Sequence, residues 1–345
     1  MVNRVAILGC GAIARAAHLP SILRARDLTV VALADNDAQN LAAAHALARG
    51  ARAVAEYRDV LAMTDVDAVV IALPPALHAD AAVGALEMGK HIYIEKPLAT
   101  SLADAERVVA AASDKAGVVA MMGFNYRFNP LTQQARAKIA ARAIGDVVAV
   151  RTVFSTAARS LAPWKQRRES GGGALLDLAV HHIDLIRHLL DASITSVSAT
   201  ITSVTAEHDT VGVQLSLTTN VVAQVFCSLS SVDEDRIDVY GTNGKLSVDR
   251  YGSLRVDVSP PGARGALGLA VNRLAGEIGA MSYGAEKRRA PMHDPSFPAA
   301  LAAFAKSIRD GSPASPSLTD GLRAIEVIDA AERSAALGQR IELRT

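Results

Sequence analysis

The stretch Gly9-Cys10-Gly11-Ala12-Ile13-Ala14 decides the fold of the N-terminal part of the chain. It follows a short apolar run and opens a segment with helical spacing. In such a loop the first glycine allows a tight turn, and the second lets the backbone approach a pyrophosphate at the helix N-terminus. The stretch therefore predicts a dinucleotide-binding loop. The residues that we expect to contact the dinucleotide are Gly9, Gly11, Ala12 and Ile13.

Around this loop, short apolar strands alternate with helical segments up to residue 123. Strands that are apolar on both faces and alternate with helices indicate a parallel sheet covered on both sides. With right-handed crossovers this becomes a doubly wound α/β Rossmann domain, which we place at residues 1–123. The expected strands are Val5–Gly9, Thr29–Asp35, Ala68–Leu73, His91–Lys96 and Val118–Met122.

Residues 124–345 are predicted to form a second, α+β domain with a large, mostly antiparallel open sheet. Apolar and small polar residues alternate along Val211–Leu217, which is typical of a sheet covered on one face only. The other expected strands are Val147–Ser155, Ile194–Val204, Val221–Leu229, Arg236–Tyr240 and Lys245–Val248, and the expected helices are Ala174–Leu190, Ala299–Arg309 and Asp320–Leu337. The segment Ser259–Pro298, with one amphipathic stretch at Leu267–Ile278, fits a lid, an oligomer contact or a long connection.

Composition excludes several classes of protein. The 36 basic and 35 acidic side chains nearly cancel, which gives no reason to expect a nucleic acid partner. The short basic run Lys287-Arg288-Arg289 is interpreted as a solvated loop. Cys10 and Cys227 are far apart and do not form a disulfide framework, and the apolar runs are shorter than a membrane span. We expect a cytoplasmic protein that does not bind membranes.

Asp35 ends the second expected strand, a little over 20 residues after the glycine loop. A carboxylate at this place accepts hydrogen bonds from the adenosine ribose and repels a 2′-phosphate. This favours NAD over NADP as the cofactor. The alternative is that Asp35 only caps the next helix.

Glu95-Lys96-Pro97 stands at the carboxyl end of the fifth strand. Ligands of doubly wound sheets bind outside these strand ends, so Lys96 is expected near the reactive ring of the cofactor. An ammonium group there can stabilise negative charge that develops on an alcohol oxygen. The alternative is an ordinary exposed lysine.

Asp177 and His181 follow three glycines at 171–173 and share one face of the expected helix, because they are four residues apart. Histidine exchanges a proton near neutral pH, and a nearby carboxylate can orient its ring. Asp184 and His188 extend the same stripe, whereas His182 points off it and is interpreted as structural. A helix-stabilising pair, a solvated stripe and a metal site are the alternatives, and we predict no metal.

Together these motifs resemble the glucose–fructose oxidoreductase, inositol dehydrogenase and MocA family. The segments Pro74-Pro75-Ala76-Leu77-His78 and Asn125-Tyr126-Arg127-Phe128-Asn129-Pro130 are also similar to that family, and the resemblance is weakest over Ser259–Pro298. It implies an NAD(H)-dependent oxidoreductase that moves a hydride between nicotinamide and a secondary alcohol or ketone of a sugar, cyclitol or sugar derivative. A reductase working in the opposite direction and a non-catalytic NAD-binding sensor are the alternatives.

The resemblance also implies roles for particular residues. Lys96, Asp177 and His181 match the catalytic set, with His181 as the proton acceptor or donor. Further cofactor contacts are expected at Leu73, Pro74, His78, Glu95, Lys96, Asn125, Trp164 and Lys165, where Lys165 departs from the arginine of some members. Substrate contacts are expected at Lys96, Arg127, Asp177 and His181. The open sheet face is expected to form a homodimer or homotetramer.

Overall fold

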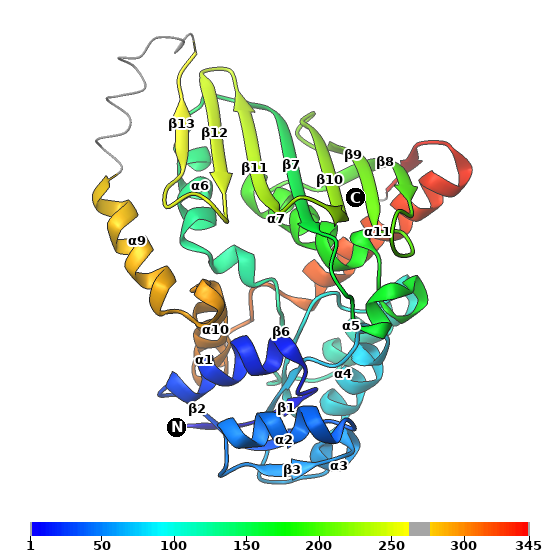
Figure 1. Ribbon diagram of the computed structural model, residues 1–345, viewed down its shortest axis with the longest axis vertical. Helices are drawn as coiled ribbons and strands as arrows, with labels where there is room; N and C mark the ends of the chain where they lie inside the picture. The colour runs from blue at the N-terminus through cyan, green and yellow to red at the C-terminus, as the bar shows by residue number, and fades with distance from the viewer. Residues whose placement is uncertain (1, 262–276, 344–345) are drawn as a thin grey trace. The chain divides into compact units, whose positions relative to one another are not determined.

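The computed structural model describes residues 2–261 and 277–343. These residues form two compact units, and Figure 1 labels their helices and strands. The first unit contains residues 1–125, 169–171 and 290–325, and the second contains residues 126–168, 172–289 and 326–345. Residues 290–325, which the sequence alone assigns to the C-terminal domain, therefore pack with the N-terminal part of the chain.

The described residues of the first unit contain a six-stranded sheet in the order β3-β2-β1-β4-β5-β6, and all of its strand pairs are parallel. This is the strand order of the doubly wound dinucleotide-binding fold that the sequence predicts. Every residue of β4 is buried, because helices cover both faces of such a sheet. The strands are β1 (Asn3–Leu8), β2 (Leu28–Ala34), β3 (Arg52–Val54), β4 (Ala68–Ile71), β5 (His91–Ile94) and β6 (Ala120–Met122).

The helices of the first unit follow the strands in alternation. The first one begins as a π-helical turn, η1 (Ala14–His18), and continues as α1. The bounds of the helices are α1 (Leu19–Arg24), α2 (Ala38–Leu47), α3 (Tyr57–Leu61), α4 (His78–Glu87), α5 (Leu102–Ser113) and α10 (Ser296–Asp310). A final helix, α11 (Leu318–Leu337), contributes residues to both units.

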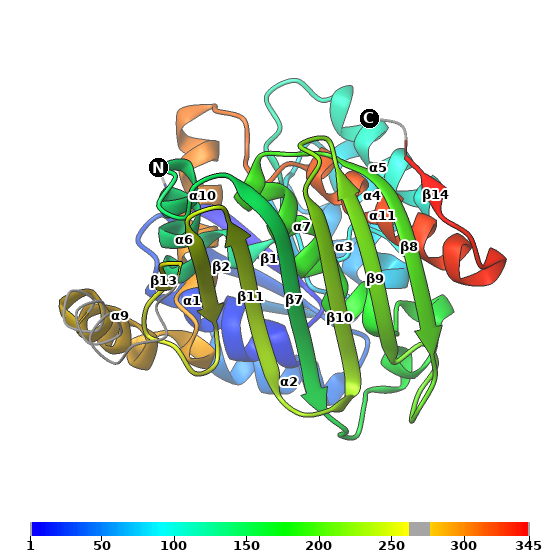
Figure 2. The ribbon, with the colours of Figure 1, turned by 90° about the horizontal axis from the view of Figure 1, so that it is seen from above.

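The described residues of the second unit contain an eight-stranded sheet in the order β13-β12-β11-β7-β10-β9-β8-β14. Only β7 and β10 pair in parallel, so the prediction of a mostly antiparallel sheet is confirmed. Figure 2 looks onto one face of this sheet, with α7 (Val180–Leu190) behind it. The strands are β7 (Val147–Ala157), β8 (Ile194–Thr202), β9 (Thr210–Leu217), β10 (Val222–Ser231), β11 (Glu234–Gly241), β12 (Gly244–Asp249), β13 (Asp257–Ser259) and β14 (Ile341–Glu342).

Helix α7 carries the predicted site of the second unit. A π-helical turn, η6 (Leu175–Ala179), leads into it, and most of its side chains are buried. Two further helices belong to this unit, α6 (Pro130–Ala140) and α9 (Glu277–Arg289). The basic run 287–289 ends α9, so its interpretation as a loop is wrong. The expected helix Leu267–Ile278 lies almost entirely outside the described residues.

No helix in the described part of the chain is both long enough and apolar enough to cross a membrane.

Candidate active site

The glycine loop lies at the carboxyl end of β1. Gly9 has a φ of +91°, and a Cβ atom there would lie 2.4 Å from the carbonyl oxygen of Ala72, so only glycine fits. At Gly11 a Cβ atom would meet no other atom within 4 Å, which leaves open space above the loop. The chain is helical from Ala12, which is exposed, and the first N–H groups of a helix have no partner inside it. The loop therefore has room for a pyrophosphate beside its helix N-terminus.

Asp35 follows β2 directly and is half-buried. Its Oδ2 atom accepts the N–H of Cys10 at 2.7 Å, and its Oδ1 atom accepts the N–H of Asp37 at 2.8 Å. The helix cap is Asp37, which accepts hydrogen bonds from the N–H groups of Gln39 and Asn40. Asp35 thus fastens the glycine loop to the neighbouring strand end, where a carboxylate meets the adenosine ribose in this fold.

Lys96 is half-buried at the end of β5, directly after the buried Glu95. Oε1 of Glu95 lies 2.8 Å from Nε2 of the fully buried His18, and its Oε2 accepts the N–H of Lys96 at 3.2 Å. Burial alone would raise the pKa of Glu95, but the hydrogen bond and charge of His18 outweigh it and lower the pKa. Glu95 is therefore held as a carboxylate inside the unit, and it fixes the backbone that carries Lys96.

His78, at the start of α4, was expected to line the cofactor. The structure buries its ring between two carbonyl groups, with Nδ1 2.7 Å from O of Pro97 and Nε2 2.8 Å from O of Leu73, and the cofactor contact stays a prediction. Burial lowers the pKa of His78, so the ring is neutral near pH 7 and donates from one nitrogen at a time. His78 ties the end of β4, with Leu73 and Pro74, to the turn after Lys96.

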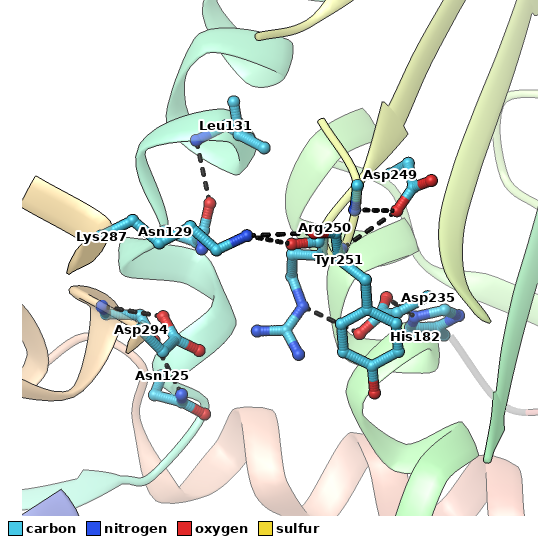
Figure 3. A network of polar contacts seen from close by, with 12 residues as sticks. Asn125, Asn129, Leu131, His182, Asp235, Asp249, Arg250, Tyr251, Lys287 and Asp294 are labelled. Atoms are coloured by element: carbon cyan, nitrogen blue, oxygen red, sulfur yellow. Dashed lines mark hydrogen bonds and ion pairs between the residues drawn. The ribbon is translucent and has the colours of Figure 1, made fainter. Parts of the chain in front are cut away.

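Asn125, which follows β6, is also buried. Its amide nitrogen donates to Oγ of Ser296 at 2.8 Å, and Ser296 begins α10. The N–H of Ser296 is held by Oδ1 of Asp294 at 3.0 Å, as Figure 3 shows for the labelled Asn125 and Asp294. Asn125 therefore anchors the returning segment 290–325 within the first unit.

Asp177, in the second unit, bonds a residue that was expected at the cofactor. Nζ of Lys165 lies 2.7 Å from Oδ2 of Asp177, and the same ammonium lies 5.3 Å from the centre of the Trp164 ring. The glycines that precede the helix explain this approach. A Cβ atom on Gly172 would lie 2.3 Å from the carbonyl oxygen of Lys165, so the chain passes here only with glycine.

His181, one turn beyond Asp177, is buried and stacks on an aromatic ring. Its ring centre lies 4.0 Å from that of Tyr126, with 11° between the planes. Phe154 of β7 packs at a tilt against both rings. The face-to-face contact fixes the plane of the imidazole, which suits a group that must present one nitrogen atom to a substrate.

Arg127 was expected to contact substrate, but the structure shows it in a buried ion pair. Its Nε and Nη2 atoms lie 2.8 Å and 2.5 Å from the two carboxylate oxygens of Asp184. The exposed fractions of the two side chains are 9% and 1%. Asp184 is therefore engaged inside the unit, and His188, further along the helix, is half-buried. The stripe expected from the sequence therefore has two parts. Asp177 and His181 form the first, and Asp184, which pairs with Arg127, belongs to the second.

Three residues that sequence reasoning did not connect hold one another beside His181. Nε2 of the buried His182 lies 3.2 Å from Oδ1 of Asp235, and Oδ2 of Asp235 accepts Nε of Arg250 at 2.8 Å (Figure 3). Burial alone would raise the pKa of Asp235, but the charge of Arg250 and the bond from His182 lower it. These residues come from α7, β11 and the turn after β12, so no local sequence motif could have predicted their contact.

Within residues 2–261 and 277–343, no group of three or more His, Cys, Asp or Glu side chains could hold a metal ion. Lys96 belongs to the first unit, and Asp177 and His181 belong to the second.

Comparison with known proteins decides the family. Residues 3–124 match the model of an oxidoreductase family with an NAD-binding Rossmann fold, and residues 132–247 match the GFO/IDH/MocA C-terminal domain. A dTDP-3,4-didehydro-2,6-dideoxy-alpha-D-glucose 3-reductase from Streptomyces violaceoruber is 31% identical over 97% of this chain and 96% of its own. The chain belongs to the GFO/IDH/MocA family. It is an oxidoreductase with an NAD-binding domain.

Other members of the GFO/IDH/MocA family are similar over nearly their whole length. The inositol 2-dehydrogenase of Rhizobium meliloti is 28% identical, over 99% of this chain and 100% of its own. The WlbA dehydrogenase of Bordetella pertussis, solved with NADH and UDP-GlcNAcA, superposes with a TM-score of 0.85 at 25% identity, and the match covers 100% of this chain and 98% of that one. The predicted family, fold class and type of enzyme are thus confirmed.

Proposed function

We propose that this chain transfers a hydride between NAD and a secondary alcohol or ketone of a sugar, cyclitol or sugar derivative. The observation that carries the proposal is the coexistence of two sets of residues in one chain. A dinucleotide loop and Lys96 stand at the carboxyl edge of one parallel sheet, and a buried histidine at the start of α7 follows a carboxylate on the turn η6. The named relatives, which act on nucleotide-linked sugars and inositol, support this class of substrate.

Each of the three polar residues has a separate role in this proposal. His181 accepts the proton of the reacting hydroxyl in oxidation and returns it in reduction. Lys96 donates a hydrogen bond to the same oxygen and stabilises its developing negative charge. Asp177, fixed by Lys165, orients the substrate. NAD, when bound at the glycine loop, supplies the hydride acceptor.

The first experiment is NADH formation by the purified protein with a panel of cyclitols, free sugars and nucleotide sugars. We expect saturable turnover with one of these classes, and Lys96→Ala should reduce kcat at least 100-fold, the scale of lost transition-state stabilisation by one donor. Lys306→Ala is the matched control, because Lys306 is exposed and pairs with Asp310 one turn further along its own helix. Full turnover in Lys96→Ala would contradict the role of Lys96.

The same assay, run in reverse, tests the direction of the reaction. If the panel gives no NADH, ketosugars with NADH test whether the chain works as a reductase. If both directions are silent while NAD still binds, the substrate lies outside the panel.

We also propose that the chain forms a homodimer or homotetramer through the open face of the eight-stranded sheet. On β10, Val222 and Phe226 are 40% and 41% exposed, and they alternate with Gln224 on the same face. Large exposed apolar side chains on a sheet face mark a contact surface. Light scattering should give a multiple of the 36.0 kDa chain mass, and Phe226→Asp should lower it.

A reducing compartment such as the cytoplasm is proposed as the place of action. Both cysteines are free and buried, as is usual where disulfides do not form. Fractionation of cells that express a tagged chain tests this directly.

A further inference from the structure

Tyr126 lies between a cation and the proposed proton-transfer group. The Cζ atom of Arg250 lies 3.3 Å from the centre of the Tyr126 ring, and the imidazole of His181 is stacked 4.0 Å from the same centre. A ring has two faces, and each neighbour is close enough to cover one of them. Arg250 and His181 therefore occupy opposite faces of Tyr126 and form a three-layer stack.

Arg250 is fixed from several directions (Figure 3). Its Nε donates to Oδ2 of Asp235 at 2.8 Å, and its backbone N–H donates to the carbonyl of Asp235 at 2.8 Å. Nζ of Lys287, on α9, donates to the carbonyl oxygens of Arg250 at 3.0 Å and of Tyr251 at 3.2 Å. The side chain of Arg250 is 11% exposed and that of Asp235 is 2% exposed. Arg250 thus reaches Tyr126 from a rigid turn.

The residue next to His181, His182, also contacts the Arg250–Asp235 ion pair. Asp235 also contacts Nε2 of His182, which follows His181 directly on α7. Phe154 stacks on His182 at 5.3 Å and packs against His181 at 6.2 Å between ring centres. Arg250 therefore contacts Tyr126, which stacks on His181, and Asp235 contacts His182. The ion pair thus reaches two consecutive residues of α7.

We propose that Arg250 is a positioning residue that acts on His181 through Tyr126, fixing the plane of the imidazole and favouring its neutral form. The inference rests on the proposed role of His181 in proton transfer. The guanidinium over one face of the phenol ring holds that ring against the imidazole on its other face. Its positive charge, only one ring away from His181, disfavours a second positive charge on the imidazole. A neutral ring is the form that accepts the hydroxyl proton in oxidation.

Two carboxylates near His181 on the η6–α7 helix are held in ion pairs within the second unit. On its own helix stand Asp177, which bonds Lys165, and Asp184, which bonds Arg127. His188 lies two turns further along. From β10, burial raises the pKa of Cys227, so that thiol is neutral. Phe154 of β7 carries no charge. Arg250 with Asp235 is thus the charged pair that reaches His181 through the Tyr126 face.

The test measures the proton affinity of His181 directly, by NMR titration of the histidine-labelled, full-length protein without substrate. The His181→Gln variant assigns its signal among the nine histidines. Arg250→Gln removes the cation and leaves the Asp235 carboxylate, so the pKa of His181 should rise by about one unit, a tenfold change in proton affinity. Asp235→Asn leaves the cation uncompensated, so the pKa should fall. Arg250→Lys should stay close to the wild type.

A purely structural role for Arg250 would not give opposite shifts from the two halves of one ion pair. Equal pKa values in all folded variants would overturn the inference. If Arg250→Gln does not fold, the double variant Arg250→Gln/Asp235→Asn has no unpaired charge, and its pKa should lie between the two single-variant expectations. The readout needs no turnover, so a failed substrate panel would sink the proposed function and leave this result standing. In an active enzyme, the acid limb of the oxidation rate should move with the pKa of His181.

Discussion

Nζ of Lys165 lies 2.7 Å from Oδ2 of Asp177, so a lysine expected at the cofactor holds the carboxylate expected at the substrate. The side chains are 31% and 12% exposed, and the contact is therefore partly shielded from water. Gly172 packs against the carbonyl of Lys165, and this contact fixes the position of the lysine backbone. The pair gives Asp177 one defined orientation.

Replacement of Lys165 tests which group it serves. Lys165→Met removes the bond to Asp177, and we expect kcat/KM for the substrate to fall about tenfold, the effect of one lost charge-assisted hydrogen bond. The Kd of NAD, measured by calorimetry, should change less than twofold. Lys165→Arg keeps the charge and should recover most of the activity. A weaker affinity for NAD with unchanged kcat would instead support the cofactor contact that the resemblance implies.

Arg127→Met should destabilise the second unit rather than act on substrate affinity alone. Arg127 and Asp184 are both buried, and the loss of one partner leaves a buried charge uncompensated. We expect the free energy of unfolding in urea to fall by about 3–5 kcal/mol. In the double variant Arg127→Met/Asp184→Leu the loss should be smaller. Wild-type stability with a raised KM in Arg127→Met would show that Arg127 serves the substrate.

Asp209 gives the second unit a defined dependence on pH. Its carboxylate is buried and accepts bonds from the Ser230 hydroxyl and from the N–H groups of Thr205, Ala206 and Val204. Burial alone would raise the pKa of Asp209, but these bonds outweigh it and lower the pKa. Asp209→Asn should lower the free energy of unfolding by about 2–4 kcal/mol at pH 7, as measured in urea.

The direction in which the stabilising effect of Asp209 changes with pH follows from its lowered pKa. The contribution of Asp209 is fully present above the pKa of an unfolded aspartate, about 3.9, and is lost as the pH falls through the lower folded value. The difference between wild type and Asp209→Asn should therefore shrink below about pH 4. Asp146→Asn is the control, because its pair with Arg142 is exposed and should contribute less than about 0.5 kcal/mol. A difference that grows in acid would contradict the assignment.

The thiol of Cys10, inside the glycine loop, should resist reaction with thiol reagents. Burial, aided by the charge of Asp35, raises its pKa to about 12, so very little thiolate exists at pH 8. Ellman's reagent should find almost no reactive thiol in the native protein and both cysteines after unfolding. Rapid reaction of one thiol in the native state would show that the loop opens.

Features formed by residues that are close in sequence could be predicted from local patterns. Gly9 could be assigned because the strand, turn and helix around it are continuous, and the order of strands then follows from the doubly wound rule. The short edge strand Arg52–Val54 was missed because three residues carry too little alternation. Helix Pro130–Ala140 was missed although Asn129 caps it and a proline begins it.

Contacts between distant segments could not be predicted in the same way. Tyr126, His181, Asp235 and Arg250 come together only when β11, the turn after β12 and helix α7 are in place. Helical spacing groups Asp184 with Asp177, but it does not reveal that Arg127 pairs with Asp184. Nor does sequence order show that residues 290–325 pack with the first unit.

Hydride transfer itself is tested most directly with a substrate from the active class that carries deuterium on the carbon of the reacting hydroxyl. Mass spectrometry of the reduced cofactor then shows whether that deuterium has moved. We predict one deuterium per NADH with the wild type, and a rate at least 100-fold lower with His181→Gln, although that variant still binds NAD. NADH without deuterium, or transfer at the wild-type rate by His181→Gln, would contradict the proposed mechanism.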